Sequence, residues 1–216
     1  MKYKYILFDM DGTVLDTLTD LTNAVNYSLE QFSLPLRTDR EIRSFLGSGA
    51  RQLIKSSAPA DYDAALFEEL LAFYKEWYDS HCIIETAPYP GMLELMERLR
   101  REGCKLAIIS NKPHSAVAEL AEHFFPGLLE LAIGEKAPLR PKPWPDMVLH
   151  AVELLSADKH DCLYVGDSEQ DIQTAANAGM DCASVTWGFR DAQHLKDKGG
   201  KCLVSTMEEL YKLIKG

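Results

Sequence analysis

Two aspartates that stand one residue apart, directly after a short apolar run, constrain this chain more than any other feature. The run Tyr5–Phe8 leads into Asp9, Met10, Asp11 and Gly12. A short apolar run that ends in a turn signal is typical of a strand buried on both faces of a sheet. Asp9 would then leave the sheet at the carboxyl end of a strand, which is the edge where α/β proteins bind ligands.

The spacing of these aspartates leaves two interpretations open. If the chain stays extended, both carboxylates face the same side while Met10 points away. Carboxylates this close repel each other unless a cation or a shared proton relieves them, which favours a metal site or a nucleophile with an acid/base partner. The alternative is purely structural, with the strand ending in an Asx turn at Asp11 and Gly12.

Length and composition restrict the class of protein. The chain has 216 residues, of which 46% are hydrophobic, so it can bury one large domain or a domain with an insertion. No apolar stretch approaches the roughly 18 residues of a membrane span, and no signal-peptide pattern precedes the first run, so we expect a cytoplasmic protein. The formal charge of −10 argues against nucleic-acid and membrane partners, and the oligomeric state stays open.

The cysteines do not indicate a metal site or a disulfide framework. They are odd in number, scattered and without a C-x-x-C pair, which is typical of reduced core thiols. They are Cys82, Cys104, Cys162, Cys182 and Cys202.

Further apolar runs alternate with helical patterns. About five strands are expected, at residues 5–8, 105–109, 131–133, 162–165 and 182–185. Met92 to Arg101 has helical spacing, Pro113 and Pro145 occupy plausible first positions of two further helices, and a capping box at Thr206 opens the last one. This alternation predicts an α/β fold with a doubly wound, mostly parallel, Rossmann-like sheet.

The segment 16–84 interrupts the alternation and has only helical patterns. Thr38 and Glu41 form a capping box. A later stripe of apolar and aromatic residues at helical spacing predicts helix packing. The stripe consists of Phe67, Leu70, Leu71, Tyr74, Trp77 and Tyr78. We therefore expect a helical cap domain of residues 16–84, inserted into a core of residues 1–15 and 85–216, where it could exclude water and select substrates.

Four motifs, in order along the chain, carry a resemblance to a known family. They are Asp9-Met10-Asp11-Gly12-Thr13, then Ser110 at the end of an apolar run, then Lys142 between two prolines, then Gly166-Asp167 followed by Asp171. With these motifs the chain resembles the haloacid dehalogenase superfamily of phosphohydrolases with an inserted helical cap, and within it the phosphoglycolate phosphatase branch. The resemblance covers essentially the whole chain, and four motifs in order are far more specific than one.

The resemblance implies a magnesium-dependent phosphatase that hydrolyses a small phosphorylated metabolite through an aspartyl-phosphate. Asp9 would be the nucleophile. Asp11 would protonate the leaving oxygen and later accept a proton from the attacking water. Mg²⁺ would be bound by the Asp9 side chain, the Asp11 backbone carbonyl and the Asp167 side chain, because it prefers hard oxygen ligands.

The phosphoryl group needs donors and a cation, because charge develops on its oxygens during transfer. Ser110 and Asn111 would donate hydrogen bonds, and Lys142 would neutralise the phosphoryl group and the nucleophile. Lys112 and Lys136 are alternatives, but prolines flank Lys142 and the family spacing points to it. A turn role is the alternative for Asn111.

Asp171 and the cap residues each have two interpretations. Asp171 either supports the metal site or caps a helix with Ser168. Gly47, Gly49 and Arg51 belong to a turn between predicted helices that faces the active site in the resembled branch. Its amides and guanidinium could bind a carboxylate or second phosphate, as in 2-phosphoglycolate, or the segment could be an ordinary turn.

Other activities remain alternatives. They include a pyrophosphatase, a nucleotide or sugar-phosphate phosphatase, a phosphomutase and, more remotely, a non-catalytic phosphate-binding regulatory module. The mutases share the core, but the sequence after Asp16 lacks the histidine expected there. A dehalogenase would not need Asp11, because halide leaves without protonation. No motif residue is missing, which argues against a silent module.

Overall fold

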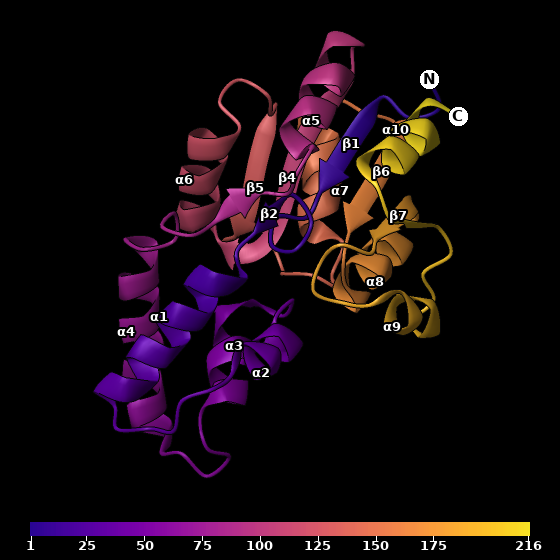
Figure 1. Cartoon of the computed structure of the whole chain (residues 1–216). Coiled ribbons are helices and arrows are strands. Elements are labelled where there is room, and N and C mark those ends of the chain that lie inside the picture. Colours follow the sequence, from indigo (N-terminus) through magenta and orange to yellow (C-terminus); the bar gives the residue numbers. More distant parts are fainter.

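A six-stranded parallel sheet forms the centre of the molecule, and a computed structural model describes all of residues 1–216 (Figure 1). The strand order is β5-β4-β1-β6-β7-β8, so the order reverses at β1. The strands are β1 (Tyr5–Phe8), β4 (Lys105–Pro113), β5 (Leu131–Glu135), β6 (Cys162–Gly166), β7 (Asp181–Val185) and β8 (Leu203–Val204). All neighbouring pairs are parallel, which confirms the predicted α/β class.

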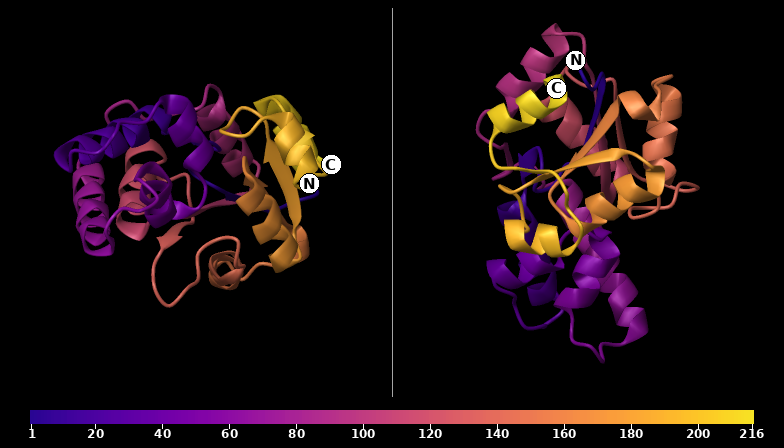
Figure 2. Two further views of the ribbon diagram at one scale, coloured as in Figure 1. Left: turned by 90° about the horizontal axis from the view of Figure 1, so that it is seen from below. Right: turned by 90° about the vertical axis from the view of Figure 1, so that its right-hand side faces the viewer.

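Helices cover both faces of the sheet (Figure 2). One face packs on α5 (Met92–Arg101), α6 (His114–Phe124) and α10 (Met207–Lys215), and the other on α7 (Asp146–Leu154) and α8 (Glu169–Ala178). A short helix, α9 (Ala192–Asp197), follows β7. Because strand side chains alternate, Ile6 and Phe8 join the first core cluster and Leu7 joins the second.

Four helices lie between two short strands and form a group beside the carboxyl ends of the main strands (Figure 1). They are α1 (Leu18–Gln31), α2 (Asp39–Phe45), α3 (Gly49–Ser57) and α4 (Ala64–Asp79). The short strands β2 (Leu15–Asp16) and β3 (Ala87–Pro88) pair antiparallel. None of the helices in the structure combines the length and the apolar composition that crossing a membrane requires.

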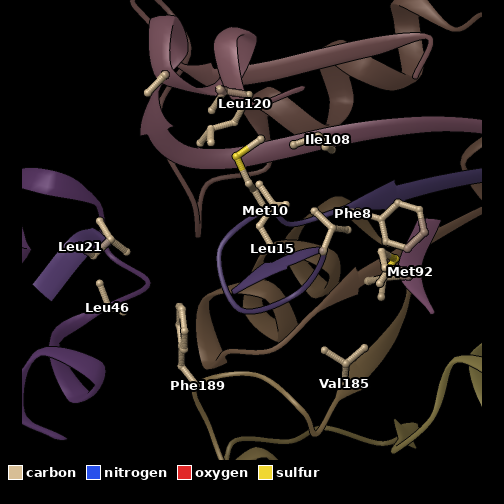
Figure 3. Close-up of a cluster of buried hydrophobic side chains, with 14 of the residues drawn as sticks. Phe8, Met10, Leu15, Leu21, Leu46, Met92, Ile108, Leu120, Val185 and Phe189 are labelled. Atoms are coloured by element: carbon tan, nitrogen blue, oxygen red, sulfur yellow. The ribbon is translucent and has the colours of Figure 1, made fainter. Parts of the chain in front are cut away.

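One apolar cluster extends from the sheet into this group of helices (Figure 3). Met10 is fully buried in the cluster, as expected if it turns away from its two neighbouring aspartates. Leu21 and Leu46 belong to it from the helical segment, and Phe189 belongs to it from the loop after β7. The helical segment therefore packs against the sheet end rather than standing free of it.

Several sequence expectations need correction. The structure adds the edge strand β8 and the β2–β3 pair, both only two residues long per strand and therefore without a sequence period. Pro113 and Pro145 are cap residues rather than first helical residues. Thr206 accepts a hydrogen bond from the Glu209 N–H, but the Glu209 carboxylate binds the Ser205 N–H, so that capping box is incomplete. The box at Thr38 is complete.

Candidate active site

A cavity of about 50 Å³ lies between the sheet end and the helical segment. We call the lining residues from the sheet domain the floor and those from α1–α4 and their connections the roof. The floor consists of Asp9, Asp11, Ser110, Asn111, Lys112, Pro113, Lys142, Asp167, Ser168, Phe189 and Arg190. The roof consists of Leu21, Leu46, Gly47, Gly49, Ala50, Leu53, Tyr74 and Tyr78. The floor thus gathers predicted residues that lie far apart in the sequence.

Asp9 and Lys142 form a buried ion pair at the end of β1. The Lys142 Nζ lies 2.8 Å from Asp9 Oδ1 and 2.7 Å from Asp171 Oδ1. Asp9 Oδ1 also accepts a hydrogen bond from the Met10 N–H, while Oδ2 accepts none. One oxygen of Asp9 is therefore held and the other is free to act on a ligand.

Asn111 holds the backbone of Lys142. Its Oδ1 accepts from the Lys142 N–H at 2.7 Å, and its Nδ2 donates to the Lys142 carbonyl and to the Gly47 carbonyl, each at 3.1 Å. Both amide donors are thus used, which differs from the expected role of this side chain as a phosphate donor. Ser110 is buried, and its hydroxyl accepts one backbone hydrogen bond and donates none, so its proton is available.

The floor holds more buried negative charge than this lysine balances. Asp9, Asp167 and Asp171 are buried, and one oxygen from each lies within 4.8 Å of the others. Burial, with the charge of Asp171 adding to it, raises the pKa of Asp9 well above its ordinary value and that of Asp167 to about 7. Burial lowers the pKa of Lys142, but Asp171 and Asp9 outweigh it and raise that pKa. A set of hard oxygen donors with excess negative charge fits Mg²⁺.

Backbone close to Asp167 fixes its carboxylate. The Phe189 N–H donates to Oδ2 at 2.7 Å, and the Thr13 hydroxyl donates to Oδ1 at 3.2 Å. A Cβ atom on Gly12, which has a φ of +80°, would lie 2.5 Å from Oδ2, and one on Gly188 would also clash with this carboxylate. Only glycine permits this approach at both positions.

Asp171 has the helix-capping contacts that one of the two interpretations predicts, and it also contacts Lys142. Its Oδ2 accepts from the Ser168 N–H at 3.0 Å and from the Ser168 hydroxyl at 2.6 Å, at the start of α8. Its Oδ1 binds Lys142 and accepts a hydrogen bond from the Tyr164 hydroxyl at 3.3 Å. Asp171 therefore caps a helix and orients the lysine with the same carboxylate.

Asp11 lies at the side of the cavity with partners of its own. Its Oδ1 accepts from the Thr17 hydroxyl at 2.8 Å and lies 3.1 Å from Lys112 Nζ. It accepts no backbone hydrogen bond, so the Asx-turn interpretation is not what the structure has. Lys112 is thus a partner of Asp11 and not of Asp9, while Lys136 is exposed and outside the cavity.

The three cap residues singled out from the sequence differ in position. Gly47 and Gly49 line the roof with φ values of +109° and +82°, a backbone region that favours glycine. Arg51 does not line the cavity. Its guanidinium pairs with Glu68 of α4 at 2.7 Å, with side chains 62% and 58% exposed. The expectation that Arg51 faces the substrate is not met, because its position on α3 directs it toward α4.

Sequence reasoning did not identify an arginine pair that joins floor and roof. Arg190 binds Glu169 at 2.9 Å and donates to the carbonyl oxygens of Arg43 and Leu46 at 3.0 and 2.8 Å. Arg43 in return donates to the carbonyl oxygens of Gly188 and Phe189, the two residues that precede Arg190. We call these contacts the arginine clasp. The available signal was the position of Arg190 shortly after the apolar run of β7.

The sequence is similar to those of known proteins of one family. Residues 6–185 match the family model of the haloacid dehalogenase-like hydrolases. Phosphoglycolate phosphatase 1 of Pseudomonas aeruginosa is 31% identical over 96% of this chain and 78% of its own length. The phosphoglycolate phosphatase of Nitrosospira multiformis is 32% identical over 98% of this chain and 95% of its own length.

Solved structures agree with the family match. A provisionally assigned phosphoglycolate phosphatase from Lactobacillus delbrueckii subsp. bulgaricus has a TM-score of 0.93 and 41% identity, covering 99% of both chains. CbbY from Rhodobacter sphaeroides, in complex with phosphate, shares the fold at 21% identity and a TM-score of 0.80 over 96% of each chain. With the predicted motifs, the sheet topology and these matches in agreement, the chain belongs to the haloacid dehalogenase-like hydrolase family and is similar over nearly its whole length to phosphoglycolate phosphatases.

Proposed function

We propose that this protein is a magnesium-dependent phosphatase that hydrolyses a small phosphate monoester, 2-phosphoglycolate, through an aspartyl-phosphate. The observation that carries the proposal is the buried pair of Asp9 and Lys142, with one Asp9 oxygen free and Asp11 beside it in the same cavity. The names of the relatives support the substrate class. The net charge of −10 favours a small metabolite over nucleic acid or membranes as partner.

The metal would be held by the side chains of Asp9 and Asp167 and by the backbone carbonyl of Asp11. The excess of buried carboxylates over lysine at the floor supports this assignment. When bound, Mg²⁺ would neutralise charge on the phosphoryl oxygens and on the nucleophile. Asp171 would act through Lys142, because its Oδ1 contacts the Lys142 ammonium while its Oδ2 accepts from the Ser168 N–H.

In the first half-reaction, the free Oδ2 of Asp9 attacks phosphorus, and the bond from phosphorus to the leaving oxygen breaks. Asp11 transfers its proton to that oxygen, while Lys142 and Ser110 stabilise the phosphoryl oxygens. In the second half-reaction, water attacks phosphorus, Asp11 takes a proton from it, and the bond to Asp9 breaks to release phosphate. One carboxyl group thus serves as acid and then as base.

We also propose a division of labour along the chain. Residues 1–15 and 85–216 form the catalytic core, and residues 16–84 form a cap that excludes water and selects the leaving group. Cytoplasmic location belongs to the same proposal. The second candidate, a non-catalytic phosphate-binding module, keeps the fold but would not turn over substrate.

The test is a phosphate-release assay of the purified protein with and without Mg²⁺. The substrates are 2-phosphoglycolate, pyrophosphate, nucleoside monophosphates and sugar phosphates. We expect the highest kcat/KM for 2-phosphoglycolate and loss of activity when a chelator removes the metal. Hydrolysis that survives complete metal removal would contradict the magnesium assignment. If one ester binds tightly and none is hydrolysed, the regulatory module is the better description.

A further inference from the structure

Three buried polar side chains near Asp11 have no role in the mechanism proposed above. They are Lys112, Tyr74 and Tyr78. The Lys112 Nζ lies 2.6 Å from the Tyr78 hydroxyl oxygen and 3.1 Å from Asp11 Oδ1. The rings of Tyr74 and Tyr78 are stacked, with centroids 5.8 Å apart and planes at 12°. All three line the cavity, and the two tyrosines come from α4, so this group joins the floor to the roof.

Tyr74 has a hydroxyl without a hydrogen-bond partner, although the residue is only 3% exposed. The sealed, unpartnered polar side-chain atoms of the structure are Thr22 Oγ1 and Gln170 Oε1, so the Tyr74 hydroxyl is not sealed in the core. Tyr74 is also one of the residues that line the cavity. Buried hydroxyls normally have a partner, so a ligand in the cavity is the natural source of one.

The group offers hydrogen-bond donors and positive charge, but few acceptors. Burial raises the pKa of both Tyr74 and Tyr78 above their ordinary values, so both keep their protons. The Tyr78 hydroxyl accepts from Lys112 and donates to no other residue, which leaves its proton free. The rest of the roof is apolar apart from its glycines, with Leu21, Leu46, Ala50 and Leu53. An acceptor on the leaving group would find hydrogen-bond donors here.

The size of the cavity limits the leaving group. A water molecule needs roughly 10 to 15 Å³ of such volume. With about 50 Å³, the cavity has room for only a few water-sized groups. A phosphoryl group with a two- or three-carbon remainder therefore requires less movement of the roof than a sugar or nucleoside would.

We propose that Tyr74, together with Tyr78 and Lys112, binds the carboxylate of a short phosphorylated hydroxy acid. This deepens the proposed phosphatase function and rests on it. When Asp11 carries the proton that it transfers in the first half-reaction, it does not neutralise Lys112, and the Lys112 charge then favours a carboxylate over a neutral hydroxyl. The adjacent apolar roof receives the carbon chain. The anion-binding role that the sequence assigned to Arg51 thereby passes to Tyr74, which lies inside the cavity where Arg51 does not.

The test compares two esters that differ only in the group the subsite would bind. These are 2-phosphoglycolate and ethyl phosphate, in which a methyl group replaces the carboxylate. We expect Tyr74→Phe to lower kcat/KM for 2-phosphoglycolate by about tenfold to a hundredfold, the usual effect of one hydrogen bond to a charged group. Ethyl phosphate should be hydrolysed at the wild-type rate. Tyr62→Phe, outside the cavity, is the matched control.

Equal losses on both esters, or no loss on 2-phosphoglycolate, would overturn the subsite while leaving the phosphatase intact. If the wild type hydrolyses neither ester, the proposed function fails instead. Calorimetric binding of 2-phosphoglycolate then decides the subsite alone. Weaker binding by Tyr74→Phe than by Tyr62→Phe supports it, and equal binding by the two variants overturns it.

Discussion

The floor and the roof of the cavity differ in how firmly their side chains are held. On the floor, Asp9 and Lys142 are buried, and Lys142 also contacts the buried Asp171, with both contacts shorter than 3 Å. On the roof, most side chains are apolar, and the Tyr74 hydroxyl has no partner at all. Charged groups that are already oriented stabilise developing charge without reorganisation. In the proposed function, the floor supplies the chemistry common to all phosphate esters, and the roof distinguishes their leaving groups.

Two sets of hydrogen bonds between these regions also differ from each other. The first set, which we call the hinge, lies where the chain passes between the helical segment and the sheet domain. There the buried carboxylate of Asp20 accepts from the Glu85 and Thr86 N–H groups and from the Thr86 hydroxyl at 2.8 to 3.0 Å. These hydrogen bonds connect the first turn of α1 to the segment just before β3. The second set is the arginine clasp, in which Arg190 donates to backbone carbonyl oxygens of the helical segment. The clasp can open by breaking hydrogen bonds alone, whereas opening the hinge would leave a carboxylate buried and unpaired.

The largest effect is expected at the floor, from Asp9→Asn. The amide cannot form the acyl-phosphate, so kcat should fall by at least ~10⁴-fold on every ester, as when a covalent nucleophile is removed. Phosphate release from 2-phosphoglycolate and from ethyl phosphate measures it, with circular dichroism to check folding. Undiminished hydrolysis of either ester would contradict the mechanism, because the chemistry would then not depend on the floor.

Lys142→Met should damage both activity and stability. It leaves Asp9 and Asp171 buried without their cation, and breaking a buried pair costs about 3–5 kcal/mol. Urea denaturation measures this loss, and kcat should also fall on every ester. Lys136→Met is the matched control, because Lys136 is exposed and outside the cavity. Equal unfolding free energies for the two variants would show that the lysine is not the partner on which the floor depends.

Arg190→Ala tests the arginine clasp between floor and roof. It removes the clasp contacts to the Arg43 and Leu46 carbonyls, which should weaken cap docking by about 1–3 kcal/mol. We expect kcat/KM to fall about tenfold and backbone amides of α2 to exchange hydrogen faster, while those of β1 stay protected. Unchanged exchange in α2 would mean that apolar packing alone holds the roof.

Arg51→Ala should have the smallest effect. The Arg51–Glu68 pair is exposed, and exposed pairs contribute little. We expect kcat/KM for 2-phosphoglycolate and the melting temperature to match those of the wild type. A selective loss on 2-phosphoglycolate, with ethyl phosphate unaffected, would return Arg51 to the substrate and argue for a roof conformation different from this one.

Much of the floor could be predicted because its residues follow apolar strands. Asp9 and Asp167 directly follow strands β1 and β6, and Ser110 follows the apolar run of β4, which continues to Pro113. Parallel strands bring these positions to one edge of the sheet. The contacts among them were harder to predict. Lys112 and Lys142 were both candidates for the phosphate, and only the fold assigns one to Asp11 and the other to Asp9. Asn111 was expected to bind phosphate, but the fold uses its amide to hold a loop.

The sequence by itself determined the class of fold, the family and the set of chemical groups at the strand ends, because these depend on residues close together along the chain. Only the tertiary structure decided which roof groups reach the cavity. Arg51 and Tyr74 both lie on helices of the same insertion, yet one points to solvent and the other into the cavity. That outcome depends on how helices rotate and pack against distant segments, which local patterns of sequence do not record.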